Sequence, residues 1–261
     1  MATLIRRENT RGSDPNASVS EDEWRMRVDL AACYRLIAHF GFNELTYNHI
    51  SARVPGPGEM ILINPFGLMF EEVRASNLVK VDLKGNVLSD PEGLGINEAG
   101  YVIHGAVHEG RPDVVCVIHT HTPAGVAVSA QAGGLLPLSQ NAMLFYDQLG
   151  YHDYEGIAIE MDERQRLARD LGSYNAMILR NHGLLTAGRS IAEAFNTMFF
   201  LENACRAQIG AMAGGGKLTM PAEESRRKVA AIYRAHGFSA SERDWPALLR
   251  LADRLDPGYR T

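Results

Sequence analysis

Two histidines stand one residue apart in the stretch Cys116–Gly125, which reads CVIHTHTPAG. In an extended strand, residues i and i+2 point to the same side, so His119 and His121 can present their imidazoles to one point. Such a pair can supply two nitrogen ligands to a divalent ion, but it can equally be a pair of hydrogen-bonded core histidines. The spacing alone leaves both interpretations open.

A third imidazole can come from His182, in the segment NAMILRNHGLLTAG. Two apolar, strand-like pieces flank it, and Gly183 permits a sharp bend between them. Three histidine ligands with one coordination position left open are typical of catalytic rather than structural zinc sites. The candidate metal ligands are therefore His119, His121 and His182.

A competing pair, His104 and His108, is spaced four residues apart on a predicted helix. Zinc proteases use H-E-x-x-H, and the stretch HGAVH lacks the glutamate that serves as base. We assign this pair a structural or supporting role. The sequence also has no Walker loop, no G-x-G-x-x-G and no G-x-S-x-G elbow, so phosphate-loop and serine-hydrolase chemistry have no support.

Local signals predict the elements that position these histidines. Helix caps stand at Ser20, Asn97, Thr122 and Ser190. The predicted strands are HISARV, EMILINP, LVKVDL, VLSD, VVCVIHTH, YEGIAIE and the two pieces around 181–183. The predicted helices cover 24–40, 97–108, a short piece after 123, DERQRLARDLG, 191–212 and two stretches after Gly216. This order predicts one α/β domain with helices on the faces of a mainly antiparallel sheet.

Composition excludes some classes of function. The net charge is -5 and the charged residues are interspersed, so no basic patch predicts binding to nucleic acid or to a membrane surface. Residues 114–146 carry no Asp, Glu, Lys or Arg, but their prolines, glycines and polar residues fit protein interior better than a lipid span. Three scattered cysteines predict reduced core thiols and a cytoplasmic protein.

Several stretches together resemble the class II aldolase/adducin family. They are YNHISARV, INPFGLMFEEVRASNLVKVDLKGNVL, RPDVVCVIHTHTPAG, YHDYEGI and LRNHGLL followed by AEAF. The resemblance runs from about residue 24 to 213 and is nearest to the adducin head domain and its bacterial relatives. It implies a three-layer α/β/α fold and a homotetramer whose active sites lie between subunits. It also implies a divalent metal, most often zinc with manganese as the alternative, on His119, His121 and His182.

The polar N-terminal residues, the extent of the resemblance and the break at Gly214-Gly215-Gly216 together divide the chain. Residues 1–20 are expected to form a disordered leader, 21–213 the class II aldolase/adducin-like domain and 214–261 a C-terminal helical extension. About 45 residues follow Gly216, without a lysine-rich tail, which disfavours an actin- or spectrin-binding role.

The chain departs from the sugar-phosphate aldolases of the family at the catalytic carboxylate. Their catalytic glutamate lies nineteen residues before the first histidine of the pair, and this chain has Gly100 there. Glu98 is close by, at the start of a helix. Asn48 of the phosphate site is kept, but Glu98 and Ala99 replace a serine pair and the matching turn reads Pro65-Phe66-Gly67. Because a carboxylate repels phosphate, we expect a substrate without a phosphate group.

These features predict a divalent-metal-dependent lyase of the decarboxylase or aldolase type. Its substrate would be a small oxo- or hydroxy-acid, cleaved through a metal-stabilised enolate. Decarboxylation does not require a base to remove a hydroxyl proton, so it is compatible with a glycine instead of a carboxylate at position 100. We expect Asn48 and Gly67 to bind substrate, and Glu98 and His49 to be catalytic, with His49 delivering a proton. The alternative is a non-catalytic assembly module like the adducin head.

Overall fold

A computed structural model of the protein describes residues 19–156 and 161–261. At its centre is an eight-stranded sheet in the order β4-β3-β2-β1-β5-β8-β7-β6. The strands are β1 (His49–Arg53), β2 (Met60–Ile63), β3 (Val79–Asp82), β4 (Val87–Ser89), β5 (Cys116–Thr120), β6 (Gly150–His152), β7 (Ala176–Leu179) and β8 (Gly183–Gly188). All neighbouring strands pair antiparallel except β6 and β7, which are parallel. The predicted α/β class with a mainly antiparallel sheet is confirmed.

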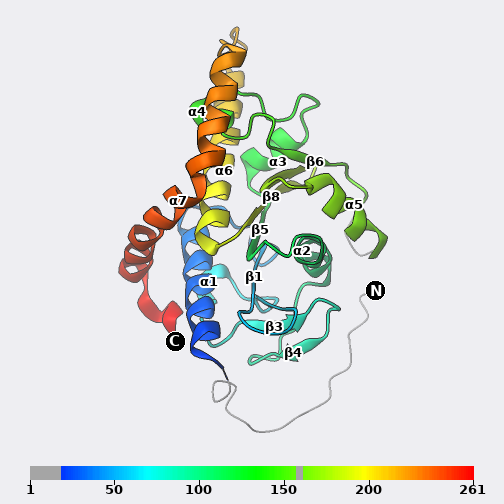
Figure 1. Cartoon of the computed structure of the whole chain (residues 1–261), viewed down its shortest axis with the longest axis vertical. Coiled ribbons are helices and arrows are strands. Elements are labelled where there is room, and N and C mark those ends of the chain that lie inside the picture. Colours follow the sequence, from blue (N-terminus) through cyan, green and yellow to red (C-terminus); the bar gives the residue numbers. More distant parts are fainter. Residues whose placement is uncertain (1–18, 157–160) are drawn as a thin grey trace.

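Helices cover both faces of this sheet. They are α1 (Glu21–His39), α2 (Glu98–Gly110), α3 (Pro123–Ser129), α4 (Gln140–Met143), α5 (Met161–Leu171), α6 (Ile191–Ala213) and α7 (Glu223–Leu255), with 3-10 turns η1 (Phe70–Glu72) and η2 (Pro257–Arg260). Figure 1 shows α1, α6 and α7 on one side of the strands and α2 and α5 on the other. The predicted three-layer α/β/α arrangement is therefore confirmed.

The predicted helix caps form as expected. The side-chain oxygens of Ser20, Asn97, Thr122 and Ser190 each accept a hydrogen bond from the backbone amide three residues later. Each cap satisfies one of the four amides that a helix start leaves without a partner. Short polar residues before an apolar periodic stretch thus fix where α1, α2, α3 and α6 begin.

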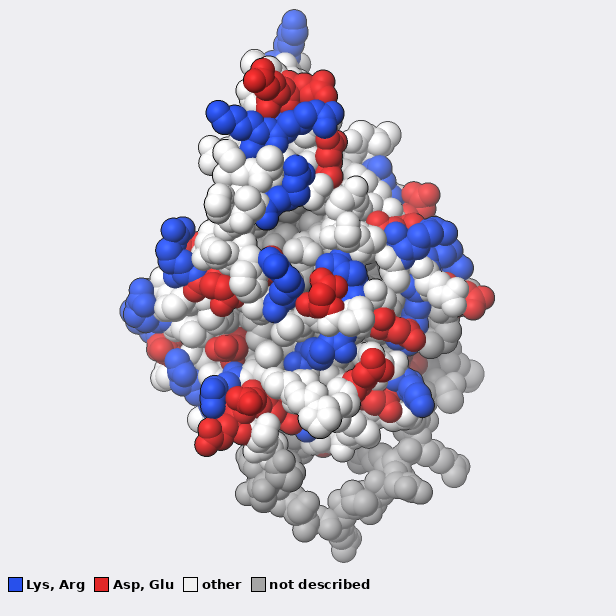
Figure 2. Space-filling model, in the orientation of Figure 1, with Lys and Arg blue, Asp and Glu red and all other residues white. Residues whose placement is uncertain are grey.

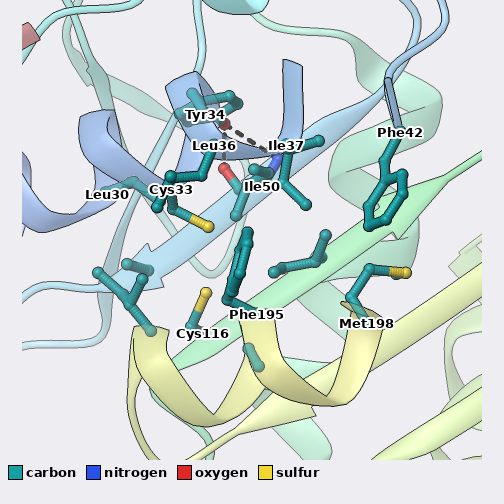
Figure 3. Packing of buried hydrophobic residues seen from close by; sticks show 14 of the residues in the cluster. Leu30, Cys33, Tyr34, Leu36, Ile37, Phe42, Ile50, Cys116, Phe195 and Met198 are labelled. Carbon is teal, nitrogen blue, oxygen red and sulfur yellow. Dashed lines mark hydrogen bonds between the residues drawn. The ribbon is translucent and has the colours of Figure 1, made fainter. Parts of the chain in front are cut away.

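The larger core lies between the sheet and α1 and α6. Figure 3 shows Phe195 of α6 beside Cys33 and Cys116, and the Tyr34 hydroxyl bonded to the backbone of Ile50. All three cysteines are buried free thiols, as predicted, and burial raises the pKa of each above its ordinary value. The protonated thiols therefore behave as apolar core groups.

A second core on the opposite face holds α2 and α5 against the sheet. Val102 and Val107 of α2 pack with Leu171 of α5 and with Val117 and Leu185 of the two central strands. Side chains alternate along β5, so Val117 and His119 face this layer while Cys116 and Ile118 face the larger core. The first candidate ligand is consequently directed toward the α2 side.

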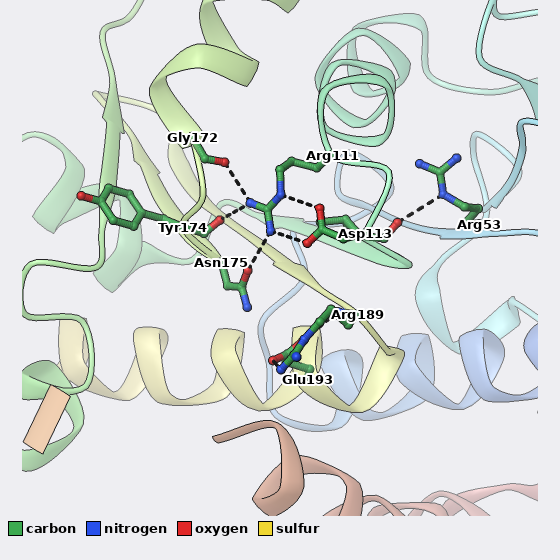
Figure 4. Close-up of polar contacts among 9 residues, drawn as sticks. Arg53, Arg111, Asp113, Gly172, Tyr174, Asn175, Arg189 and Glu193 are labelled. Carbon is green, nitrogen blue, oxygen red and sulfur yellow. Dashed lines mark hydrogen bonds and ion pairs between the residues drawn. The ribbon is translucent and has the colours of Figure 1, made fainter. Parts of the chain in front are cut away.

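Arg111, just after α2, joins β5 to the segment that leads into β7. Its guanidinium makes a bidentate pair with Asp113 and donates to the carbonyl oxygens of Gly172 and Tyr174 (Figure 4). Asn175 accepts a further bond from it. These contacts fix the start of the strand that carries His119 relative to the strand that leads to His182.

The uncharged run 114–146 has a mixed environment. Residues 116–120 are fully buried in β5, whereas most side chains between α3 and α4 are only half-buried. Within the described residues, no helix combines the length and apolar character that a membrane crossing requires. On the molecular face shown in Figure 2, basic and acidic side chains are intermixed, in keeping with the pattern expected from the sequence.

Two predicted elements differ from the structure. Of the strand predicted at 154–160, residues 154–156 are not in a strand, and residues 157–160 lie outside the described part. The chain pairs with β7 earlier, at Gly150–His152, and then leaves the sheet for the α5 crossover that a parallel pair requires. The two predicted C-terminal helices are one helix, α7, with Pro246 inside it. Residues 1–18 of the predicted leader also lie outside the described part.

The C-terminal segment packs into the main core rather than standing apart from it. Trp245, Ala252 and Tyr259 are buried in the cluster that contains α1 and α6. Figure 1 shows α6 and α7 side by side, with the connection between them projecting beyond the sheet. The helical character predicted for 214–261 therefore holds from Glu223 onward.

Candidate metal centre

The three predicted ligands come together at one end of the sheet. The Nε2 atom of His119 lies 2.8 Å from Nε2 of His121 and 3.3 Å from Nε2 of His182. One nitrogen from each ring lies within 4.8 Å of the other two. His119 is fully buried, whereas His121 and His182 are partly exposed. The group is thus anchored in the protein on one side and accessible from solvent on the other.

Hydrogen bonds at the opposite ring nitrogens orient two of these histidines. Nδ1 of His119 lies 2.9 Å from the carbonyl oxygen of Leu184, and Nδ1 of His121 lies 2.8 Å from a carboxylate oxygen of Glu44. A carbonyl and a carboxylate only accept, so each Nδ1 carries the proton. The Nε2 lone pairs then face the centre of the group, as they do in histidines that bind metal.

Electrostatics keep the rings of His119 and His182 neutral. Burial, followed by the neighbouring His182 and His121, lowers the pKa of His119 well below its usual value. Burial and His121 lower the pKa of His182 to about 4. Neutral imidazoles with converging lone pairs repel one another, and a cation between them removes that repulsion. The donor set therefore fits a divalent metal ion.

The separations also suit a small ion. A tetrahedral zinc ion with nitrogen ligands at about 2.0–2.1 Å sets neighbouring ligands roughly 3.3 Å apart. The 3.3 Å between His119 and His182 matches this value, and the 2.8 Å between His119 and His121 requires only a small opening. Three ligands leave a fourth position for a substrate or water.

The turn between β7 and β8 places His182. Asn181 adopts a left-handed conformation with φ of 54°, and the amide of His182 bonds to the carbonyl oxygen of Leu179. Gly183 passes so close to β5 that a Cβ atom there would lie 2.3 Å from the carbonyl oxygen of Thr120. The sequence Asn-His-Gly therefore supplies a residue that tolerates the left-handed bend, the ligand and a close backbone approach.

His121 lies one residue beyond the end of β5, at Thr120, rather than within the strand. Its imidazole nevertheless reaches the same centre as that of His119, with ring centroids 4.6 Å apart. Thr122, the next residue, caps α3. The strand end and the helix start thus hold His121 between them.

His49, the first residue of the predicted strand HISARV, is buried at the start of β1. It begins β1 directly opposite His119 of β5, and the two rings stack with centroids 5.5 Å apart. Its ring also covers Gly100 of α2, where an added Cβ atom would lie 2.4 Å from His49 Nε2. His49 therefore occupies the space that a side chain at position 100 would need. Burial lowers its pKa, and its Nδ1 has no hydrogen-bond partner among the described residues.

Behind His49 lies the second histidine pair. The Ser51 hydroxyl oxygen is 2.6 Å from His104 Nδ1 and 2.8 Å from His108 Nε2, and all three side chains are buried. Burial lowers the pKa of both histidines to about 3. His104 packs edge-on against His49, with centroids 5.3 Å apart. The pair points to Ser51 rather than to the three converging rings, in keeping with a supporting role.

The other predicted site residues occupy different surroundings. Asn48 is fully buried, its Oδ1 accepts from the amide of Glu44, and its Nδ2 has no partner among the described residues. Glu98 is exposed as the first residue of α2, and Gly67 is exposed with φ of 95°. No hydrogen bond joins either of them to the three converging histidines in the described part of the chain.

Sequence reasoning missed Glu44, which contacts His121 from 77 positions away. Glu44 precedes β1 in a polar stretch, NELTYN, where no periodicity or motif marks it. Only the folded arrangement brings this loop beside the end of β5.

This chain is similar in sequence to known proteins. Residues 28–209 match the family model for the class II aldolase and adducin N-terminal domain. A Pseudomonas aeruginosa protein, named as a candidate class 2 aldolase, is 52% identical over 95% of this chain and 96% of its own. Mouse alpha-adducin is 41% identical over 96% of this chain, which spans only 36% of that longer protein.

Solved structures agree with these matches. An aldolase II superfamily protein from Pseudomonas syringae superposes with a TM-score of 0.91 at 51% identity, covering 94% of this chain and 98% of that one. An L-fuculose 1-phosphate aldolase from Glaciozyma antarctica superposes with a TM-score of 0.81 at 27% identity, covering 98% and 97%. The chain is a member of the class II aldolase and adducin N-terminal domain family.

Proposed function

We propose that this protein is a divalent-metal-dependent lyase that cleaves a carbon–carbon bond in a small oxo- or hydroxy-acid without a phosphate group. The observation that carries the proposal is the convergence of three imidazoles, two of them with their outer nitrogens bonded to acceptors. His119, His121 and His182 would hold the ion, with zinc favoured for an all-nitrogen site and manganese as the alternative. Bound there, it would act as a Lewis acid on a substrate carbonyl, the help that aldol cleavage and decarboxylation share.

His49 is the residue that we propose meets the substrate beside this ion. Its ring stacks on His119 and fills the space over Gly100, so no carboxylate can stand at that position without displacing it. The position of His49 suits it to deliver a proton to the product carbon. With a histidine in place of a carboxylate, decarboxylation is favoured over an aldol cleavage that needs a strong base.

The absence of a phosphate on the substrate is supported at two points. The amide of Phe66, in the turn that precedes Gly67, already donates to the carbonyl oxygen of Gly95. At the start of α2, the Asn97 side chain accepts from the amide of Gly100, and Glu98 adds a negative charge to the first turn. Both features disfavour the binding of an anion, because anions bind best to free backbone amides at the positive end of a helix. Asn48, with its unpartnered Nδ2, would bind a substrate oxygen instead.

The proposal includes a homotetramer with the active sites between subunits. The uncharged segment between α3 and α4 is only half-buried in one chain. Large apolar side chains are also exposed around the metal ligands: Leu45 and Tyr47 flank the loop of Glu44, and Tyr154 stands 6.4 Å from the ring of His182. Contact with a neighbouring chain would cover them.

A substrate screen tests the proposal. Zinc- and manganese-loaded protein is incubated with 2-oxo acids, with 2-hydroxy and 4-hydroxy-2-oxo acids, and with a ketose 1-phosphate. Carbon dioxide and aldehyde release are measured separately. We expect turnover of a non-phosphorylated acid that disappears on metal removal and falls in His49→Gln. Turnover only of the ketose phosphate, or equal turnover without metal, would contradict the proposal.

The second candidate function is a non-catalytic assembly module. It is favoured by the 41% identity to mouse alpha-adducin over nearly the whole chain. A protein of this kind would show no turnover of any acid in the screen while keeping its fold and its oligomeric state.

A further inference from the structure

His121 is distinguished from the other two predicted ligands by a charged partner. Glu44 Oε2 lies 2.8 Å from His121 Nδ1, whereas the corresponding nitrogen of His119 bonds to the backbone carbonyl of Leu184. A strand backbone fixes the second contact, because His119 and Leu185 are paired between β5 and β8. The first contact depends on one side chain from a loop.

The loop that carries Glu44 is held in an unfavourable conformation. Leu45, the next residue, has φ of 45°, a region that bulky side chains avoid, and the residue is 62% exposed, so burial of its side chain does not offset the strain. The amide of Glu44 donates to Asn48 Oδ1 at 2.5 Å, and the amide of Tyr47 donates to the carbonyl oxygen of Glu44. Local strain that the surroundings enforce in this way is concentrated at functional sites.

A chain of contacts through α6 ties the same loop to the histidine segment. The Thr122 hydroxyl donates to the carboxylate of Glu202, a fully buried residue of α6. Arg206 Nε donates to the other oxygen of Glu202 at 2.7 Å, and its guanidinium lies 5.0 Å from the ring centre of Phe42. Thr122 follows His121 and Phe42 precedes Glu44 by two residues. Through these contacts, α6 helps to fix the distance between the Glu44 carboxylate and the His121 imidazole.

We propose that Glu44 is a positioning residue of the metal centre: its carboxylate holds His121 in the tautomer and orientation that present Nε2 to the ion. The inference rests on the metal site of the proposed function. A carboxylate behind a histidine ligand also makes its other nitrogen a stronger donor, and loss of such a partner lowers metal affinity or activity by about 10- to 100-fold. Glu44 is about half-exposed, with a side-chain exposure of 54%, so orientation rather than long-range attraction carries the effect.

Zinc affinity, measured by competition with a chromogenic chelator, tests this role without any substrate. Glu44→Ala removes the acceptor and is expected to weaken zinc binding by about 10- to 100-fold. Glu44→Gln keeps an oxygen that can accept from Nδ1 and is expected to lose less. Glu71→Ala removes another exposed glutamate, which no hydrogen bond or ion pair joins to a histidine in the described part of the chain, and should bind as the wild type does. The unfolding midpoint of the metal-free variants should stay near that of the wild type, because Glu44 is not a core residue.

The outcomes separate this inference from the proposed function. If wild-type protein binds zinc and Glu44→Ala binds it equally tightly, the contact is only a surface ion pair and the inference is overturned, while the metal site stands. If the wild type itself binds no zinc, both fall. If Glu44→Gln loses as much affinity as Glu44→Ala, orientation through an acceptor oxygen is refuted as the mechanism.

Discussion

The imidazole of His49 lies directly over Gly100, with Nε2 2.4 Å from the place where a Cβ atom of residue 100 would stand. Two residues 51 positions apart in sequence therefore exclude one another: one can carry a large side chain only while the other carries none. Real Cβ atoms do not approach this closely, so the pair is a constraint on every variant of the site. The His49 ring also explains why residue 100 is a glycine, although the first turn of a helix otherwise favours residues with less backbone freedom.

This exclusion predicts a specific pattern of stability. Gly100→Ala should lower the free energy of unfolding by about 1–3 kcal/mol, because the His49 ring must move within a packed layer. Adding His49→Ala should recover part of that loss, a coupling that a double-mutant cycle measures in urea unfolding. Gly210→Ala, in α6 with nothing within 4 Å of the added Cβ atom, is the matched control and should be neutral or slightly stabilising. Independent, additive effects of the first two substitutions would show that the ring and the glycine are not coupled.

Glu98 provides a second prediction, on catalysis. If it acts as base, Glu98→Gln should abolish turnover of the substrate found in the screen and leave the bound zinc unchanged, because within the described residues no hydrogen bond joins Glu98 to the three histidines. Its exposed place at the start of α2 gives it access to solvent. Should the variant keep full turnover, base catalysis lies elsewhere and the decarboxylase form of the proposal gains support. Metal analysis of the same preparation is the control.

The pH dependence of stability follows from His104 and His108. Burial lowers the pKa of each to about 3, whereas an unfolded histidine has a pKa near 6.5. Between these values the unfolded chain takes up protons that the folded chain does not. The stability contributed by the neutral rings is complete above about pH 6.5 and is lost as pH falls toward about 3, by up to about 1.4 kcal/mol per pH unit for each ring.

Urea unfolding of metal-free protein at pH 7.5 and pH 5.0 measures this effect. Stability is expected to be lower at pH 5.0, and His236→Ala, at an exposed position of α7, should keep the same difference. His49, His119 and His182 have lowered pKa values and act in the same direction. Equal stability at the two pH values would therefore show that these histidines are not buried as neutral groups.

Oligomeric state gives a further prediction. One chain has a mass of 28.7 kDa, and light scattering at micromolar concentration should give about four times that value. Tyr154→Ser and Leu45→Ser remove exposed apolar side chains near the ligands and should shift the population toward smaller species if these residues are covered by a neighbour. A mass of one chain for the wild type would remove the tetramer from the proposal.

Short-range patterns were sufficient for much of this molecule. The caps at Ser20, Asn97, Thr122 and Ser190 set the helix starts, and the alternation of apolar residues identified most strands. Local signals also singled out the i, i+2 pair His119 and His121 and, at a glycine bend, His182. That the three share one metal was implied by the resemblance to the class II aldolase/adducin family, because local patterns do not show which distant segments meet after folding.

Glu44 and His49 show why parts of the site could not be predicted from the sequence. Glu44 reaches His121 because Leu45 accepts a left-handed backbone that leucine disfavours, and no composition rule predicts such strain. His49 belongs to a polar stretch, yet antiparallel pairing of β1 with β5 buries it beside His119. The parallel strand at Gly150–His152 was not predicted, because its three residues show no apolar alternation.

The central claim is that these three histidines hold one divalent ion per chain, and metal content tests it most directly. Protein loaded with zinc, freed of unbound metal and measured by inductively coupled plasma mass spectrometry should carry one zinc per chain. His182→Ala should lose most of it, and His236→Ala, which alters an exposed histidine outside the site, should retain it. A wild type that retains no zinc, or a His182→Ala variant that retains a full equivalent, would contradict the account.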